Sequence, residues 1–361
     1  MRLRFLFLIL GLGGYAQQTT IAVVEAFVGN FSSSNVSVIN TVTNTISATV
    51  AVGSGSTSVA ISPNGSFVYV TNQSSATTSA IRTFDNMVVA SIGVGSSPQD
   101  VAFTPNGSFA WVTNNASGTN VRIIDVSTHT VSTSFALGAS FLRGVALTPD
   151  GAFAYITSNA TNNNVRRVRT SDNVVGPTIS VGTLPQDIAI TPNGSFAYVP
   201  NSTGNTTSVI RMSDNAVVAT IGVGSSPQGV AISPNGSFVY VTNNGGANVS
   251  VIDTSNNTVT ATVTVGSGPW YLAVTPNSSL VYVANNSSNS VSVINASNNT
   301  VTATITVGSA PRGVAIGVAI IPFFITGGVV ISACESDEDE EDCCHWGWEE
   351  EAAWEEEGIA N

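Results

Sequence analysis

The chain has 361 residues, a formal net charge of −12, ten arginines and no lysine. Its acids are concentrated near the C-terminus: residues 335–357 hold thirteen of the 22, whereas residues 17–334 contain nine acids and eight arginines. A nearly neutral body lacks the basic surface that a phosphate backbone requires, so we expect no nucleic-acid partner.

The N-terminal sequence MRLRFLFLILGLGGYA has the layout of a secretory signal. Two arginines precede an apolar run from Phe5 to Leu12, and the run ends in the small-x-small group Gly14-Tyr15-Ala16. This pattern predicts a signal peptide over residues 1–16 and a secreted, cell-surface or periplasmic location. An uncleaved membrane anchor is the alternative.

An internal repeat organises the region that follows. The stretch SPNGSFVYVTN occupies residues 62–72 and returns unchanged at 233–243. The proline of this group recurs every 42 to 44 residues, at Pro63, Pro105, Pro149, Pro192, Pro234 and Pro276. Such a period is typical of four-stranded propeller blades or of paired helices. The segments are short, alternating and β-branched, with Gly, Pro and Asn between them, so the pattern favours strands.

Counting the strands gives the architecture. First strands begin at seven places, which are Val59, Val101, Val145, Ile188, Val230, Leu272 and Val314. We therefore predict an all-β fold, a seven-bladed β-propeller of four-stranded blades over residues 17–320. The region opens on a second strand and closes on a first strand. The C-terminal first strand should thus complete the N-terminal blade, which would pair the two edges that an open ring exposes.

The second strands carry the family resemblance. Their signature is Tyr69-Val70-Thr71-Asn72, repeated as Tyr240-Val241-Thr242-Asn243, with variants in the other blades. Over roughly residues 20–317 the chain resembles the YVTN-repeat β-propellers of archaeal surface layers and of secreted or periplasmic bacterial proteins. The resemblance implies a scaffold or binding surface and brings no shared active site with it.

Residues able to perform catalysis are sparse in the repeats. His129 is the one histidine before the tail, and it stands in a rim turn where the equivalent turns carry Asn, so we expect it to be solvent-exposed. No second histidine is present to build a triad or a zinc site around it. Asp125 and Asp253 hold equivalent turn positions, where we expect Asx turns. All three cysteines lie in the tail.

The positions just before each first strand vary where the rest of the repeat is monotonous. They should form a ring at one mouth of the central channel, and variable polar and aromatic residues on a rigid scaffold are where binding sites occur. The candidate binding residues are Gln99, Asp100, Arg143, Gln186, Asp187, Gln228, Trp270, Tyr271 and Arg312. We expect no cofactor and no catalytic residue among them.

Three interpretations of this ring stay open. Its side chains could only solvate the channel mouth, with Arg143 and Arg312 pairing with Asp100 and Asp187. They could bind a small molecule or a peptide. The third interpretation is a cation bound to the two aspartates, although two carboxylates provide few of the oxygen ligands that Ca²⁺ requires. We expect no metal.

The C-terminal region departs from the repeat. Residues 318–334 carry no charge, and residues 321–334 could form an anchor or an apolar plug, although Pro322 and Gly327-Gly328 interrupt the run and no Lys or Arg follows it. Residues 335–361 form an acidic tail that we expect to be disordered. Numerous N-x-S/T sequences are glycosylation sites only where the secretory route glycosylates.

The preferred prediction is a non-enzymatic scaffold, secreted or at the cell surface, that binds a protein or glycan partner through one face. The alternative is a metal-dependent hydrolase or a lactonase-like enzyme that uses Asp100 and Asp187 at the channel mouth. A purely structural role in a surface array is the third possibility.

Overall fold

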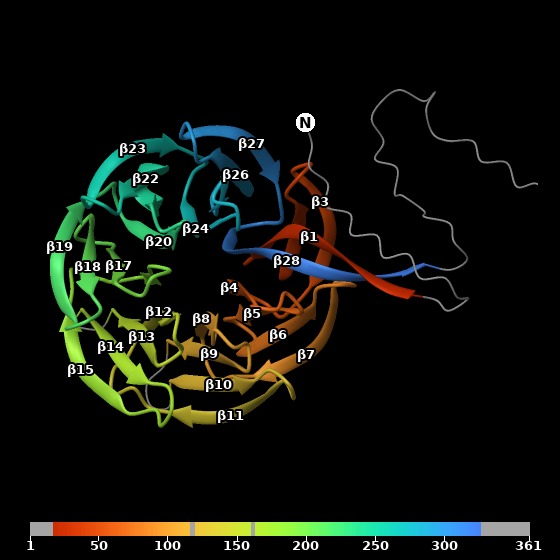
Figure 1. Ribbon diagram of the computed structural model, residues 1–361, viewed down its shortest axis with the longest axis horizontal. Helices are drawn as coiled ribbons and strands as arrows, with labels where there is room; N and C mark the ends of the chain where they lie inside the picture. Colours follow the sequence, from red (N-terminus) through yellow and green to blue (C-terminus); the bar gives the residue numbers. More distant parts are fainter. Residues whose placement is uncertain (1–16, 116–119, 160–162, 326–361) are drawn as a thin grey trace, which may run out of the picture. The chain divides into compact units, whose positions relative to one another are not determined.

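The computed structural model describes residues 17–115, 120–159 and 163–325. The predicted signal peptide (1–16), the acidic tail (335–361) and part of the apolar segment therefore lie outside the described residues. Within them, seven four-stranded antiparallel sheets are arranged in a ring around a central axis (Figure 1). The predicted seven-bladed β-propeller is confirmed.

Six blades each use four consecutive strands. The first three of these blades contain β4 (Ser56–Ile61), β5 (Phe67–Asn72), β6 (Thr77–Arg82) and β7 (Met87–Gly93); β8 (Pro98–Phe103), β9 (Phe109–Asn114), β10 (Val121–Asp125) and β11 (Thr130–Phe135); β12 (Leu142–Leu147), β13 (Phe153–Ser158), β14 (Asn164–Arg169) and β15 (Val175–Ser180). The next three contain β16 (Ala189–Ile190), β17 (Phe196–Asn201), β18 (Thr206–Arg211) and β19 (Ala216–Gly222); β20 (Pro227–Ile232), β21 (Phe238–Asn243), β22 (Asn248–Asp253) and β23 (Thr258–Thr264); β24 (Pro269–Val274), β25 (Leu280–Asn285), β26 (Ser290–Asn295) and β27 (Thr300–Thr306).

The seventh blade joins the two ends of the repeat region. Its strand order is β28-β1-β2-β3, with β28 (Pro311–Ile325), β1 (Gln17–Asn30), β2 (Asn35–Asn40) and β3 (Thr45–Ala51). In Figure 1 the red strand β1 and the blue strand β28 lie side by side. The predicted closure by a C-terminal first strand agrees with this sheet. A single 3-10 turn, Asn244–Gly246, is the one helical element of the described residues, and none of their helices has the length and apolar character to cross a membrane.

The P-N-G turns join the first and second strands as their chemistry predicts. In the first of them the Gly65 N–H donates to the Ser62 carbonyl at 2.8 Å, and Asn64 Oδ1 accepts from the Ser66 N–H at 3.1 Å. Gly65 has φ +70°, a left-handed conformation that glycine adopts without steric cost. The recurrence of this group in the repeats therefore follows from the hairpin geometry.

The apolar core lies between blades rather than inside them. One cluster combines Tyr240, Val249 and Val251 of one blade with Val281 and Val283 of the next, and all five are almost fully buried. Seven such clusters fill the spaces between blades. Because each blade buries its faces only against its neighbours, the ring is stable only when it is complete.

The asparagine that ends the Y-V-T-N motif is a packing residue. Asn243 is fully buried, and its Nδ2 donates to Ser250 Oγ of the next strand at 2.9 Å. A Cβ at Gly224, in the loop from the preceding blade, would lie 2.6 Å from the Asn243 amide. The motif thus joins neighbouring blades, and its asparagine is not available for a ligand.

The turns between third and fourth strands include the expected Asx turns. Asp125 Oδ1 accepts from the Ser127 N–H at 2.9 Å, and Asp253 Oδ1 accepts from the Ser255 N–H at 2.8 Å. His129 differs from the prediction, because it is partly buried: its Nδ1 is 2.7 Å from the Tyr69 hydroxyl of the neighbouring blade. The exposed position expected from its turn is wrong, since the blades pack closely enough to cover that turn.

Candidate functional site

Most of the predicted ring residues lie in β-bulges of the innermost strands. In five blades the pairing between the first and second strands shifts where these residues stand, whereas Gln186 and Asp187 lie between an isolated bridge at Pro185 and the short strand β16. The shifts fall between Ser56 and Val59, Pro98 and Asp100, Leu142 and Val145, Pro227 and Val230, and Pro269 and Leu272. A bulge turns side chains out of the regular alternation and frees backbone groups from the ladder. The ring is therefore built by a repeated irregularity.

In four blades the threonine of the Y-V-T-N motif is hydrogen-bonded to the backbone beside the ring, whereas Pro200 and Ala284 take its place in two others. Thr242 Oγ1 accepts the Gly229 N–H at 2.8 Å and donates to the Trp270 carbonyl of the next blade at 2.5 Å. Thr157 makes the equivalent pair of bonds to the Gly144 N–H and the Gln186 carbonyl, at 2.8 and 3.2 Å. Sequence reasoning assigned this threonine no role in the site, although its recurrence beside the ring was the available signal.

Asp100 is buried, with 8% of its surface exposed. Its Oδ1 accepts from Ser58 Oγ at 2.6 Å and from the Val101 N–H at 2.9 Å, and its Oδ2 accepts from the Val145 N–H of the next blade at 2.8 Å. Burial raises the pKa of this carboxyl, while the three hydrogen bonds favour its ionised form and oppose the rise.

Asp187 has the same 8% exposure and fewer donors. Its Oδ1 accepts from the Ile188 N–H at 2.8 Å and its Oδ2 from the Val230 N–H of the next blade at 2.9 Å. The place that Ser58 takes beside Asp100 is held here by Gly144, which has no hydroxyl. Burial, and then the charge of Asp100, hold the pKa of Asp187 well above its ordinary value. The two carboxyls therefore titrate as a pair, and Asp187 keeps its proton to the higher pH.

Tyr271 shares the electrostatic environment of both aspartates. Burial, followed by the charges of Asp187 and Asp100, raises the pKa of its phenol well above the usual range, and Arg143 and Arg312 act in the opposite direction. The phenol thus stays protonated and can donate a hydrogen bond at physiological pH. The five residues form one group of interacting charges at the channel mouth.

The two arginines are held by neutral groups. Arg143 Nη1 donates to Gln99 Oε1 at 2.8 Å. The Arg312 guanidinium carbon lies 3.6 Å from the centre of the Phe31 ring and 4.6 Å from that of Trp270, which is cation–π stacking on both sides. Burial lowers the pKa of Arg312. Among the described residues neither arginine forms an ion pair with Asp100 or Asp187, so that predicted pairing is wrong: glutamine and aromatic rings hold both guanidinium groups instead.

The two remaining predicted residues hydrogen-bond to loops around the mouth. Gln186 Nε2 donates to the Leu184 carbonyl at 3.2 Å, and Gln228 Nε2 donates to Ser202 Oγ at 3.1 Å. The structure thus brings together Asp100, Asp187, Tyr271 and the two arginines, and it uses the glutamines to fix loops and Arg143.

Glycines alternate with the large side chains around the ring. Gly144 follows Asp100, Gly229 follows Asp187, and a Cβ at either glycine would lie 2.6–2.9 Å from atoms of the next blade. Such distances leave no room for a side chain, so the carboxylates of Asp100 and Asp187 can extend over the glycines to reach backbone N–H groups beyond them. Among the described residues, no group of three or more His, Cys, Asp or Glu gathers in a way that could hold a metal ion.

Comparisons with known proteins support the propeller class. Residues 216–315 match the family model described as lactonase, 7-bladed beta-propeller. No curated protein matches the chain significantly. Solved structures similar in fold include the hydrazine synthase of Kuenenia stuttgartiensis, with a TM-score of 0.70 at 22% identity over 74% of this chain and 91% of that one.

Two further structures match with the same TM-score of 0.70. One is a functionally unknown protein from Desulfotomaculum acetoxidans, at 23% identity over 82% of this chain and 98% of that one. The other, from Bacteroides uniformis, carries the provisional description of a 6-phosphogluconolactonase, at 18% identity over 82% and 99% of the two chains. At these identities the structures show the fold alone.

The family-model match corrects one prediction. We expected a protein that is not an enzyme, and the lactonase match over residues 216–315 contradicts this. Sequence reasoning erred because the repeat motif serves packing and carries no catalytic residue, so the motif gave no sign of an enzymatic activity. The finer assignment to the YVTN repeats is not tested by these matches and stays a prediction.

Proposed function

We propose that this protein is a hydrolase of lactones or similar cyclic esters, with its active site at the channel mouth. The observation that carries the proposal is the pair of buried carboxyls, Asp100 and Asp187, whose environments separate their proton affinities. Pairs of titratable groups pushed apart in this way supply the acid and the base of hydrolytic enzymes. The lactonase match over residues 216–315 supports the reaction class.

The hydrogen bonds support a different proposed role for each carboxyl. Asp100 has three donors that favour its anion, so it acts as the general base and takes a proton from the attacking water. Asp187 keeps its proton and acts as the general acid. The water oxygen bonds to the carbonyl carbon, the ring C–O bond breaks, and the Asp187 proton goes to the leaving oxygen. The product is a hydroxy acid.

Tyr271 and the arginines would stabilise the negative charge of the transition state. The protonated phenol of Tyr271 can donate to the carbonyl oxygen as that oxygen becomes an anion. Arg143, positioned by Gln99, and Arg312, held between two rings, provide fixed positive charge beside the site and for the carboxylate of the product. Because both arginines are held by neutral partners, their charges are not cancelled.

The test is hydrolysis of γ-butyrolactone, δ-valerolactone and glucono-δ-lactone by the full chain, followed as acid release at constant pH. We expect turnover above the buffer rate, and a loss of about 100-fold or more in kcat for Asp187→Asn and for Asp100→Asn. The matched control is Asp214→Asn, an exposed aspartate paired with Arg211 at 2.6 Å, which should leave kcat unchanged.

The outcome that contradicts the proposal is a folded parent without activity on any of these lactones, or activity that both aspartate variants retain. Addition of EDTA separates this mechanism from the metal-dependent alternative. An acid–base pair predicts an unchanged rate, whereas a rate that falls with EDTA and returns with a divalent cation would favour the metal.

A further inference from the structure

An arginine lies between two blades at a position that is apolar in every other blade. It is Arg167 of β14, which pairs in register with Tyr155 of β13. The residues in the same register of the other six third strands are apolar and almost fully buried, and they are Val38, Ala80, Ile123, Val209, Val251 and Val293. The packing of the blades therefore does not require a charge at this position.

The outer strand of this blade leaves room for the guanidinium group. The pairing of β14 with β15 is irregular between Arg166 and Val168, and Gly176 lies in this irregularity. A Cβ at Gly176 would lie 3.5 Å from Arg167 Nε and 3.8 Å from its Nη2, so a longer side chain there would crowd the guanidinium group. The guanidinium carbon of Arg167 lies 4.5 Å from the centre of the Phe153 ring, which is a cation–π contact. The glycine and the ring together give the guanidinium group a fixed place.

Arg167 lines a groove between the β12–β15 blade and the β16–β19 blade. The groove has a volume of about 650 Å³, within the usual range for a small-molecule site, and Phe196 and Met212 give it half-buried apolar walls. Arg211 also lines it, but the charge of Arg211 is compensated by Asp214 at 2.6 Å. Arg167 forms no ion pair with any other described residue, so its charge remains available to a ligand.

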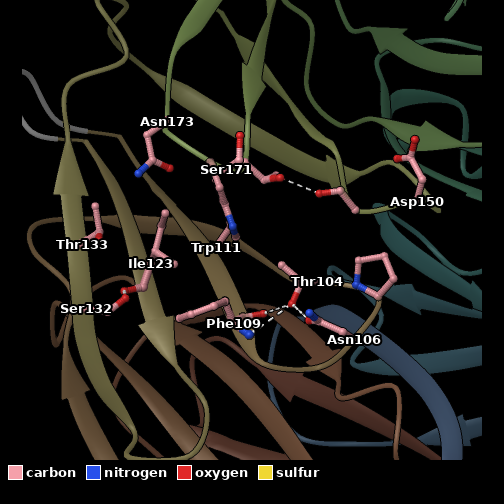
Figure 2. Close-up of a pocket in the computed structure, with 13 residues that line it drawn as sticks. Thr104, Asn106, Phe109, Trp111, Ile123, Ser132, Thr133, Asp150, Ser171 and Asn173 are labelled. Carbon is pink, nitrogen blue, oxygen red and sulfur yellow. Dashed lines mark hydrogen bonds between the residues drawn. The ribbon is translucent and has the colours of Figure 1, made fainter.

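The neighbouring groove shows what is particular about this one. It lies between the β8–β11 blade and the β12–β15 blade and has a similar volume of about 550 Å³ (Figure 2). There Ile123 takes the place of Arg167, and Ser132 lies in the irregularity of the outer strand in place of Gly176. The lining of this neighbouring groove includes no Arg, Lys or His. The cation therefore distinguishes the two grooves, whereas the space between the blades does not.

A carboxylate in the lining of the Arg167 groove is a second departure from the repeat. The five other turns of this kind have Asn after the proline, whereas this blade has the exposed Asp150. Asp150 Oδ1 accepts from Thr148 Oγ1 at 2.5 Å and from the Ala152 N–H at 2.9 Å, and these bonds lower the pKa of its carboxyl. Asparagine makes the same bonds in the other turns with one oxygen, so the charge of Asp150 is not needed for folding.

The charges of Arg167 and Asp150 both act on the Tyr155 phenol. Burial raises the pKa of Tyr155, the charge of Arg167 opposes this rise, and the charge of Asp150 adds to it. The two charges thus lie in the same part of the groove, although they form no ion pair with each other among the described residues. A ligand that places its own two opposite charges against them would be complementary to this groove.

We propose that this groove binds a small zwitterion of the amino-acid class with an apolar side chain. The planar fork of Arg167 matches the carboxylate of such a ligand, and Asp150 Oδ2 accepts from its ammonium group. Phe196 and Met212 offer apolar surface to its side chain. A simple acid would be repelled by Asp150 and a simple amine by Arg167. The groove lies at the end of the first strands opposite to the channel mouth, and the site does not depend on the proposed hydrolysis.

The test measures binding of L-alanine, L-valine, L-leucine, L-methionine and L-phenylalanine to the full chain, by saturation-transfer NMR and then by calorimetry. We expect saturable binding of at least one of them at roughly millimolar Kd, which is ordinary for a small ligand with few contacts. Analogues that lack one charge should bind at least about tenfold more weakly, because each leaves one charged group of the groove without its partner. For leucine these analogues are 4-methylpentanoate, without the ammonium group, and 3-methylbutylamine, without the carboxylate.

Two substitutions convert the groove to the form of the other blades. Arg167→Val and Asp150→Asn should each weaken binding by about tenfold or more. The matched controls are Arg169→Gln, which removes an exposed arginine of the same strand that pairs with Asp172, and Asp253→Asn, which removes a carboxylate from a turn outside the groove; both should bind as the parent does.

The proposal is overturned if none of the amino acids shows saturable binding. It is also overturned if either leucine analogue binds as tightly as leucine, or if Asp150→Asn binds as tightly as the parent. The analogues are measured on the parent, and Asp150→Asn keeps the turn of the other blades, so these results decide the question even where Arg167→Val is less stable.

Discussion

Replacing Thr242 by valine tests whether the Y-V-T-N threonine holds the ring together. Thr242 is fully buried, and valine has nearly the same shape, so no cavity forms. The change removes the acceptor of the Gly229 N–H and the donor to the Trp270 carbonyl. Each buried group left without a partner costs about 1–3 kcal/mol, so we expect a loss of about 2–5 kcal/mol in the free energy of unfolding.

Urea denaturation and calorimetry measure this loss. At about 2 °C per kcal/mol for a chain of this size, the melting temperature should fall by roughly 4–10 °C. Thr262→Val is the matched control, because Thr262 is exposed on the outer strand β23 and should change stability by less than about 0.5 kcal/mol. Thr242→Ser keeps the hydroxyl and should recover most of the loss. If Thr242→Val is no more destabilising than Thr262→Val, the bonds of Thr242 contribute nothing measurable and the reasoning fails.

Three further predictions use the same logic. Gly224→Ala should destabilise by about 2–4 kcal/mol because its Cβ would lie 2.6 Å from the Asn243 amide, whereas Gly222→Ala, with nothing within 4 Å, should be nearly neutral in the same urea titration. Burial lowers the pKa of His129, so the unfolded chain binds the extra proton first and stability should fall as pH drops below about 6.5; His129→Asn should flatten that slope, and an unchanged slope would contradict the assignment. The pKa of Asp187 is raised, so the folded state holds a proton that the unfolded state loses above about pH 4. Its unfavourable contribution therefore grows as pH rises, and Asp187→Asn should gain stability relative to the parent between pH 4 and 7; a difference independent of pH would argue against the raised pKa.

The architecture could be predicted from the sequence because each strand and each hairpin is specified by a short stretch of neighbouring residues. A period of 42 to 44 residues, alternating β-branched segments and P-N-G turns each specify one strand or one hairpin, and the offset at the two ends specifies the closure. The ring positions were found for a related reason: they vary in a repeat that otherwise does not. Asp100 and Asp187 were identified as candidates in this way.

The partners of these residues could not be predicted, because they come from neighbouring blades. Whether Arg312 pairs with a carboxylate or stacks between Phe31 and Trp270 depends on distances across the ring. The burial of His129 depends on the tyrosine of the previous blade. Spacing along the chain specifies which strand a residue occupies, but the contacts across a seam depend on how closely two blades approach.

The alternation of large residues and glycines limits how the channel mouth can change in evolution. Asp100 and Asp187 each extend over the glycine of the next blade, and from this spacing we infer that two neighbouring inner positions cannot both carry a side chain larger than serine. In a ring of seven, this rule permits at most three, and Asp100, Asp187 and Tyr271 already occupy them. No further inner position at the channel mouth can therefore take a large side chain. A new functional group could be gained there only by exchanging one of these three, or by a paired substitution that moves a glycine along with it, so single-step diversification should be confined to the outer positions and the loops.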